Sequence, residues 1–232
     1  MTAAVRAVLF DLDGTLVDSE IHTDTAIGVV AERHGFPGYS LPHSETRGRT
    51  WEHVAEVMRA GTGMAVDAPA LAEELLTYWM GIAADVAPVP GAPEAIREAA
   101  MRLPLGVVSS SPRAVIDSFL GKLGIADCVD ARARIGGDGV RASKPDPDGF
   151  LQGARALGVL PAGCLVFEDS QAGLLAARAA GMRSMFVMCC AADIPGNTLL
   201  ATAACMDYRS LPAGFWEQVA DGSLDFAGRV YA

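Results

Sequence analysis

Two aspartates separated by a single residue form the part of this sequence best suited to chemistry. Asp11 and Asp13 follow residues 5–9, an apolar run with the length and β-branched character of a buried strand. Residues two apart in a strand share one side, and ligands bind at the carboxyl ends of strands in an open parallel sheet. Two carboxylates this close repel each other unless a proton or a divalent cation lies between them. We therefore predict a magnesium-dependent site with an aspartate nucleophile.

Three more polar groups follow predicted strands. Ser109 comes directly after an apolar run and precedes a predicted helix, whose first N–H groups can bind an anion. Lys144 is one of only two lysines in the chain, and its compact charge suits a phosphoryl oxygen and a carboxylate together. Glu168 and Asp169 end a third apolar run. Alone, each would be a helix cap, a turn or a surface residue; together, at one edge of a sheet, they indicate phosphoryl transfer.

The elements that must position these groups show two different patterns. Residues 20–87 lack strand signals and carry apolar residues at helical spacing over 23–33, 51–60 and 68–84. From residue 88 onward strands alternate with helices, which predicts a parallel sheet covered on both faces. The sequence thus predicts an α/β fold: a doubly wound, Rossmann-like core made of residues 1–17 and 88–232, with an inserted α-helical domain of residues 18–87.

Within the core, strands and helices are predicted in strict alternation. Apolar runs of strand length occur at four places after the helical insert, at residues 105–108, 128–131, 164–167 and 184–188. Helices are expected before the first of these runs, at residues 90–101, and between the runs, up to residue 123 and at residues 147–157 and 171–180.

The composition and net charge limit the classes of molecule that this protein is expected to bind. The 232 residues are 51% apolar and 20% charged, as in an ordinary globular protein. The net charge of −10 argues against nucleic acid and anionic membranes as partners. No apolar run approaches the ~20 residues that span a bilayer, and the N-terminus leads directly into the first strand. Five scattered cysteines suit free thiols in a reducing compartment. We expect a cytoplasmic monomer or dimer.

The quoted groups resemble a known set of motifs. Residues 11–15, Ser109, Lys144 with Pro145, and Glu168 with Asp169 resemble, in order, the four signature motifs of the haloacid dehalogenase-like (HAD) hydrolase superfamily. Residues 10–20 and 167–173 are most similar to the branch that contains sugar phosphatases and β-phosphoglucomutases. The resemblance covers nearly the whole chain, and residues 18–87 stand where that branch has its helical cap domain.

The resemblance implies a catalytic and metal-binding role for each acidic residue. Asp11 would attack phosphorus and form a phosphoaspartate, while Asp13 would protonate the leaving oxygen and later deprotonate water. Mg²⁺ would be held by the Asp11 carboxylate, the Asp13 backbone carbonyl and Asp169, with Glu168 reaching it through water. Magnesium prefers oxygen ligands and keeps several waters, so this small set suffices.

The resemblance also implies which residues hold the substrate. Ser109, the Ser110 N–H and Lys144 would bind the remaining phosphoryl oxygens. In the helical insert, residues 47–51, with Arg49 among them, and Glu20 are the candidate contacts to the leaving group. The guanidinium groups of this segment can bind hydroxyls or a second anion. The predicted partner is a small phosphorylated metabolite.

Several chemistries occur in the superfamily. Dehalogenation needs neither a metal nor a second aspartate, and phosphonate cleavage uses a cap lysine that residues 18–88 lack. Mutases use a cap histidine and a cap arginine; His22 lies one residue out of step, and Arg49 matches only loosely. We therefore predict a Mg²⁺-dependent sugar phosphatase. A β-phosphoglucomutase-like mutase is the alternative, and a non-catalytic phosphoacceptor module of the signalling kind is the alternative from another class.

Overall fold

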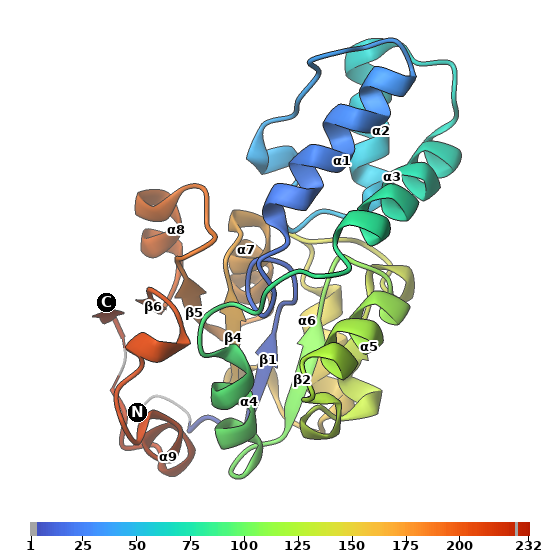
Figure 1. The fold of residues 1–232 in the computed structure, drawn as a ribbon. Coiled ribbons are helices and arrows are strands. Elements are labelled where there is room, and N and C mark those ends of the chain that lie inside the picture. The colour runs from blue at the N-terminus through green and yellow to red at the C-terminus, as the bar shows by residue number, and fades with distance from the viewer. Residues whose placement is uncertain (1–3, 226) are drawn as a thin grey trace.

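A single parallel sheet organises the molecule, which a computed structural model describes over residues 4–225 and 227–232 (Figure 1). The sheet has seven strands in the order β3-β2-β1-β4-β5-β6-β7, and each neighbouring pair is parallel. The strands are β1 (Ala7–Phe10), β2 (Leu105–Val108), β3 (Arg134–Ile135), β4 (Cys164–Glu168), β5 (Arg183–Val187), β6 (Ala203–Cys205) and β7 (Val230–Tyr231).

Helices cover both faces of this sheet. They are α4 (Ala92–Ala100), α5 (Arg113–Lys122), α6 (Asp148–Ala156), α7 (Gln171–Ala179), α8 (Ile194–Leu200) and α9 (Phe215–Asp221). Alternate residues of β1 separate the two cores: Val8 and Phe10 belong to the cluster with α4, α5 and α9, whereas Ala7 and Leu9 belong to the cluster with α6 and α7. The predicted doubly wound α/β fold is confirmed.

Three helices form the insert between β1 and α4: α1 (Glu20–Arg33), α2 (Trp51–Thr62) and α3 (Ala68–Ile82). They gather beyond the carboxyl ends of the strands (Figure 1). Trp51 and Trp79 are buried between α2 and α3, with ring centroids 6.0 Å apart. The two connections to the core run side by side, since Val17 bridges to Pro88. The division into two domains at these positions stays a prediction.

The structure differs from the predicted elements in two places. The strand expected at residues 128–131 is wrong, because 3-10 turns occupy Ala126–Cys128 and Ala131–Ala133, and β3 begins only at Arg134. The Asp130 carboxylate accepts the Arg132 N–H at 2.8 Å and so favours a turn where a strand was expected. The elements from α8 to β7 were not predicted. None of the helices in the described residues is both long and apolar enough to cross a bilayer.

Candidate active site

Strand register places the first aspartate at the centre of the carboxyl edge. Phe10 pairs with Val107 on one side and with Phe167 on the other, so the residues that follow these three meet at one point. The Asp11 N–H donates to the Phe167 carbonyl at 2.9 Å, and Asp11 is only 3% exposed. The residues before it on β1 and β4 are fully buried, and the Phe10 and Phe167 rings stack with centroids 5.1 Å apart. Asp11 therefore stands where two buried strands end.

Lys144 joins the ends of three strands. Its buried ammonium donates to the Asp11 carboxylate, to Glu168 Oε1 at 2.6 Å and to the Val108 carbonyl at 3.2 Å. Burial opposes the charge of Lys144, but Asp11 and Glu168 outweigh it and hold the pKa of Lys144 above its usual range. Burial raises the pKa of Asp11, although Lys144 acts against this rise. The predicted contact of Lys144 with the acidic residues is thus present.

Asp169 lies beside the loop that follows β1, where it contacts Thr15. The carboxylate is 1% exposed, and its Oδ1 accepts the Thr15 hydroxyl at 3.0 Å. Its Oδ2 is buried without a hydrogen-bond partner. Burial, with the nearby Glu168 charge, raises the pKa of Asp169. Gly14 (φ 77°) leaves room for this oxygen, because a Cβ there would lie 2.3 Å from Asp169 Oδ2.

The residues at this edge fit a magnesium ion. In residues 4–225 and 227–232, no three His, Cys, Asp or Glu side chains are arranged as a ready metal cluster. Magnesium, however, takes few protein ligands, and the predicted set includes the backbone carbonyl of Asp13. Every predicted donor is an oxygen, and Asp169 Oδ2 is buried and unpaired. Because Lys144 is the ammonium shared by Asp11 and Glu168, a divalent cation would offset the remaining negative charge.

Three hydroxyls fix the second aspartate. Ser19 donates to Asp13 Oδ1 at 2.8 Å, and Ser109 and Ser111 donate to Oδ2 at 3.1 and 2.8 Å. The Ser111 N–H in turn donates to Ser109 Oγ at 2.9 Å. Ser109 therefore contacts the side chain predicted to be the acid–base group, and Asp13 is held in one orientation toward the cavity.

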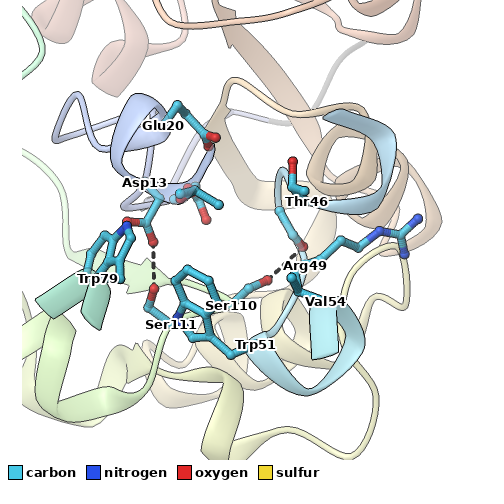
Figure 2. A pocket seen from close by; sticks show the side chains of 12 residues that line it. Asp13, Glu20, Thr46, Arg49, Trp51, Val54, Trp79, Ser110 and Ser111 are labelled. Carbon is cyan, nitrogen blue, oxygen red and sulfur yellow. Dashed lines mark hydrogen bonds between the residues drawn. The ribbon is translucent and has the colours of Figure 1, made fainter. Parts of the chain in front are cut away.

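A cavity opens between these aspartates and the helical insert (Figure 2). One wall is apolar, made of Trp51, Val54 and Trp79. Glu20 lies on the opposite side and is 7% exposed; burial raises its pKa to about 8, against the effect of the neighbouring Arg47. The other residues lining it are polar or small: Thr23, Thr46, Gly48, Arg49, Ser110 and Ser111, together with Asp11 and Asp13.

Two of the predicted binding residues contact protein groups at this cavity. The Ser110 hydroxyl donates to the Gly48 carbonyl of the insert at 2.7 Å (Figure 2). Arg49 donates to the Lys144 carbonyl at 2.9 Å and to the Ser44 carbonyl at 3.3 Å. Both residues line the cavity, so the structure brings together all nine predicted site residues: Asp11, Asp13, Glu20, Arg49, Ser109, Ser110, Lys144, Glu168 and Asp169.

Comparison with known proteins identifies the family. A family model described as haloacid dehalogenase-like hydrolase matches residues 5–181. The chain belongs to the haloacid dehalogenase-like hydrolases. It is 39% identical to a validoxylamine A 7′-phosphate phosphatase of Streptomyces hygroscopicus subsp. limoneus over 76% of this chain and 83% of that protein. It is 32% identical to a fructose-1-phosphate phosphatase of Escherichia coli over 78% and 95% of the two chains.

A solved structure shares the fold of this chain. The β-phosphoglucomutase of Clostridium difficile superposes with a TM-score of 0.78 and 22% identity, over 94% of this chain and 98% of that one. At this identity the likeness concerns the fold alone. The predictions of a HAD-type hydrolase and of its fold are therefore confirmed.

Sequence reasoning did not predict four polar residues of this HAD-type site. Ser19 and Ser111 hold Asp13, Thr15 holds Asp169, and Asn197 donates to the Asp169 carbonyl at 3.4 Å. The acceptor of the Thr15 hydroxyl lies 154 residues away in the sequence, where no local pattern could show it. Ser111 could have been found, because it stands two positions after Ser109 in a run of serines.

Proposed function

We propose that this HAD-type hydrolase is a Mg²⁺-dependent phosphatase of small phosphate monoesters, with sugar phosphates as substrates. One observation carries the proposal: Asp11 and Asp13 line a single cavity at the tip of β1, and the Lys144 ammonium donates a hydrogen bond to the Asp11 carboxylate. Phosphoryl transfer asks mainly for a placed nucleophile, a proton donor and positive charge near the equatorial oxygens. These three side chains supply all of them.

The reaction would proceed in two steps. An Asp11 carboxylate oxygen attacks phosphorus, the bond from phosphorus to the ester oxygen breaks, and Asp13 gives that oxygen its proton. In the second step Asp13 takes a proton from water, which attacks the phosphoaspartate at phosphorus. Inorganic phosphate leaves and the Asp11 carboxylate is restored. Ser19, Ser109 and Ser111 orient Asp13 for both proton transfers.

The phosphoryl group would be bound by residues on both sides of Asp11. Lys144 is hydrogen-bonded to Asp11, and the Ser109 hydroxyl is hydrogen-bonded to Asp13. Both groups can therefore reach oxygens of a phosphoryl group bound at Asp11. Asp11, the Asp13 carbonyl and Asp169 would hold the cation, with Glu168 behind them. Bound Mg²⁺ would supply positive charge to the phosphoryl oxygens.

The cavity favours a polyol as the leaving group. Trp51 and Trp79 offer an apolar wall, and Glu20, Thr23 and Thr46 offer groups that can bind hydroxyls. With a pKa of about 8, the Glu20 carboxyl keeps its proton at neutral pH and can donate to a sugar oxygen. Two relatives are named for phosphatase activity on validoxylamine A 7′-phosphate and fructose 1-phosphate, which agrees with such a substrate.

The helical insert would act as a cap over this site. We propose that residues 18–87 open to admit substrate and close to exclude water, with the paired connections near Val17 and Pro88 as hinges. The mutase alternative is weaker, because His22 does not lie among the residues lining the cavity. Absence of nucleic-acid and membrane partners, cytoplasmic location and a monomeric or dimeric state remain predictions.

Release of phosphate from p-nitrophenyl phosphate and from a panel of sugar phosphates tests this function. We expect Mg²⁺-dependent turnover that EDTA removes and added Mg²⁺ restores. Asp11→Asn should lower kcat on the order of 10⁴-fold or more, because it removes the nucleophile. Asp85→Asn, an equivalent change at an exposed position of the insert, should leave the rate unchanged. Turnover that survives EDTA or Asp11→Asn would rule out the proposal.

A further inference from the structure

Two adjacent cysteines follow β5 and take no part in the proposed reaction. Cys189 is exposed and Cys190 is half-buried, and both are free thiols. Their sulfur atoms lie 3.5 Å apart. A disulfide bond needs a separation of about 2.05 Å, so the two sulfurs are neighbours that must still approach each other before they can bond.

The surroundings make the two thiols unequal. The hydrogen bond from Cys190 lowers the pKa of the Cys189 thiol, whereas the same bond, burial and the nearby Asp18 charge raise the pKa of Cys190. An exposed thiol with a lowered pKa is the kind that reacts with oxidants, and a second thiol beside it can resolve the product.

The cysteine pair also contacts the insert. The Cys190 carbonyl accepts a hydrogen bond from the Arg47 guanidinium. Arg47 Nε lies 3.4 Å from Glu20 Oε2, and Glu20 lines the cavity over Asp11. A single side chain therefore connects the backbone of the cysteine pair to a residue of the proposed substrate cavity.

We propose that Cys189 and Cys190 form a reversible redox site, in which a hydroperoxide converts the dithiol to a vicinal disulfide that alters the Arg47 contact. The Cys189 thiolate attacks the terminal peroxide oxygen and becomes a sulfenic acid, and the alkoxide or hydroxide released takes a proton. Cys190 then attacks the Cys189 sulfur, and water leaves. Overall, two thiols and one hydroperoxide yield one disulfide, one alcohol (or water) and one water.

Ring closure would disturb the backbone at this point. Cα atoms of adjacent residues lie about 3.8 Å apart, which is below the roughly 4.4 Å at which disulfides usually begin. The peptide groups of Cys189 and Cys190 must therefore turn, and the Cys190 carbonyl moves with them. Exposed and strained disulfides are easily reduced, so the site would return to the dithiol with ordinary thiol reductants.

Mass spectrometry of the full chain after hydrogen peroxide treatment tests the site directly. We expect the loss of two hydrogen atoms, a peptide map that locates this loss in the one peptide containing both Cys189 and Cys190, and reversal by dithiothreitol. Cys189→Ser and Cys190→Ser should each abolish the cross-link, whereas Cys128→Ser, a matched change at another half-buried cysteine, should retain it. A link to Cys205, a link between two molecules, or only sulfinic acid would overturn the proposal.

The effect on turnover rests on the proposed phosphatase function and is measured separately. Oxidation should lower kcat/KM for a sugar phosphate about tenfold, which is the worth of one hydrogen bond to a charged group. Dithiothreitol should restore the rate, and Arg47→Gln should make the remaining rate insensitive to peroxide. A disulfide that forms without changing kcat/KM would overturn the Arg47 coupling. A reduced enzyme without any turnover would overturn the function and leave the mass result intact.

Discussion

Lys144 is the residue on which the charge balance of the site depends. It is 5% exposed and lies between Asp11 and Glu168, two carboxylates that are themselves shielded from water. A buried ion pair adds little net stability, but removing one partner leaves an uncompensated charge in a medium of low polarity. The proposed function uses the same ammonium to bind phosphoryl oxygens.

Lys144→Met should therefore destabilise the protein as well as stop the reaction. We expect a loss of about 3–5 kcal/mol in the free energy of unfolding at neutral pH, because two buried carboxylates lose their partner. Urea unfolding followed by circular dichroism measures it. The only other lysine supplies the control: Lys122 is exposed, and its ammonium donates to the Ala84 carbonyl at 2.9 Å and lies 5.0 Å from the Phe119 ring centroid. Lys122→Met should therefore change the free energy of unfolding by less than about 1 kcal/mol. Equal losses in both variants would refute the assigned charge balance.

Residue types and the family resemblance together predicted the nine candidate site residues but not the partners of those residues. Asp11, Lys144 and Asp169 could be predicted because a strand end, an unusual residue type and a repeated acidic pair all point to one edge. Thr15 contacts Asp169 across the loop, and such a contact depends on tertiary packing that no local pattern contains. Arg47 likewise binds a carbonyl 143 positions away.

At the scale of the elements, the turn after β1 has to bring its backbone close to Asp169. Gly14 has φ 77°, and a Cβ at this position would overlap the Asp169 carboxylate. Gly63, at the end of α2, has nearly the same φ of 74° but no atom within 4 Å of a built Cβ. The two glycines thus share a positive φ and differ in what surrounds them.

Gly14→Ala and Gly63→Ala separate backbone strain from the loss of the site. Gly63→Ala should lower the free energy of unfolding by about 1–2 kcal/mol, because alanine disfavours the left-handed region. Gly14→Ala should lower it further, because its Cβ would also overlap the Asp169 carboxylate. Only Gly14→Ala should also remove Mg²⁺-dependent turnover and the increase in Tm that Mg²⁺ binding is expected to produce in the unmodified protein. Thermal melts with and without Mg²⁺ measure both effects. Normal Mg²⁺ dependence in Gly14→Ala would contradict the proposed position of the ion.

The start of α6 depends on a carboxylate whose charge is strongly favoured. Asp148 accepts the Arg141 N–H at 2.8 Å and the Gln152 side chain at 2.9 Å, and these bonds with Arg141 lower its pKa to about 2. A depressed pKa stabilises the fold above the unfolded-state pKa of about 3.9, and this stability is lost as the pH falls toward 2.

Asp148→Asn should therefore cost about 1–2 kcal/mol of unfolding free energy at pH 6, a figure reduced because the Arg141 side chain is largely exposed. The difference in unfolding free energy between the variant and the unmodified protein should fall to about half of this value at pH 3, because the Asp148 carboxyl is then largely protonated in the unfolded state. Urea titrations at several pH values measure it, and Asp127→Asn, at an exposed position, serves as control. A pH-independent difference would mean that packing, and not charge, stabilises this helix start.

Elements with a continuous apolar run could be predicted from the sequence, and strands of two residues could not. The strand β2 agrees with its prediction to the residue, because its apolar run is continuous. The strands β3 and β7 have two residues each, too few to show any periodicity. Their pairing comes from neighbours that are distant in sequence, as when Ala204 pairs with Val230.

At the scale of the whole molecule, residues 47–49 of the insert are hydrogen-bonded to the core. The Arg47 guanidinium binds the Cys190 carbonyl, the Gly48 carbonyl accepts the Ser110 hydroxyl, and Arg49 donates to the Lys144 carbonyl. These three consecutive residues contact three different loops of the core, each at the carboxyl edge of the sheet. Closure of the proposed cap would therefore depend on hydrogen bonds from this segment to the loops that bear Ser110 and Lys144.

Arg49→Gln tests whether these contacts set the closed state. A neutral, shorter side chain cannot span the Ser44 and Lys144 carbonyls as the guanidinium does, so the closed state should be less populated. We expect kcat/KM for a sugar phosphate to fall about tenfold, while the free energy of unfolding changes by less than about 1 kcal/mol. Arg33→Gln is the matched control, since Arg33 pairs with Glu74 on the exposed surface of the insert and such pairs are worth little. If both variants kept full activity, residues 47–49 would not control closure of the insert over the core.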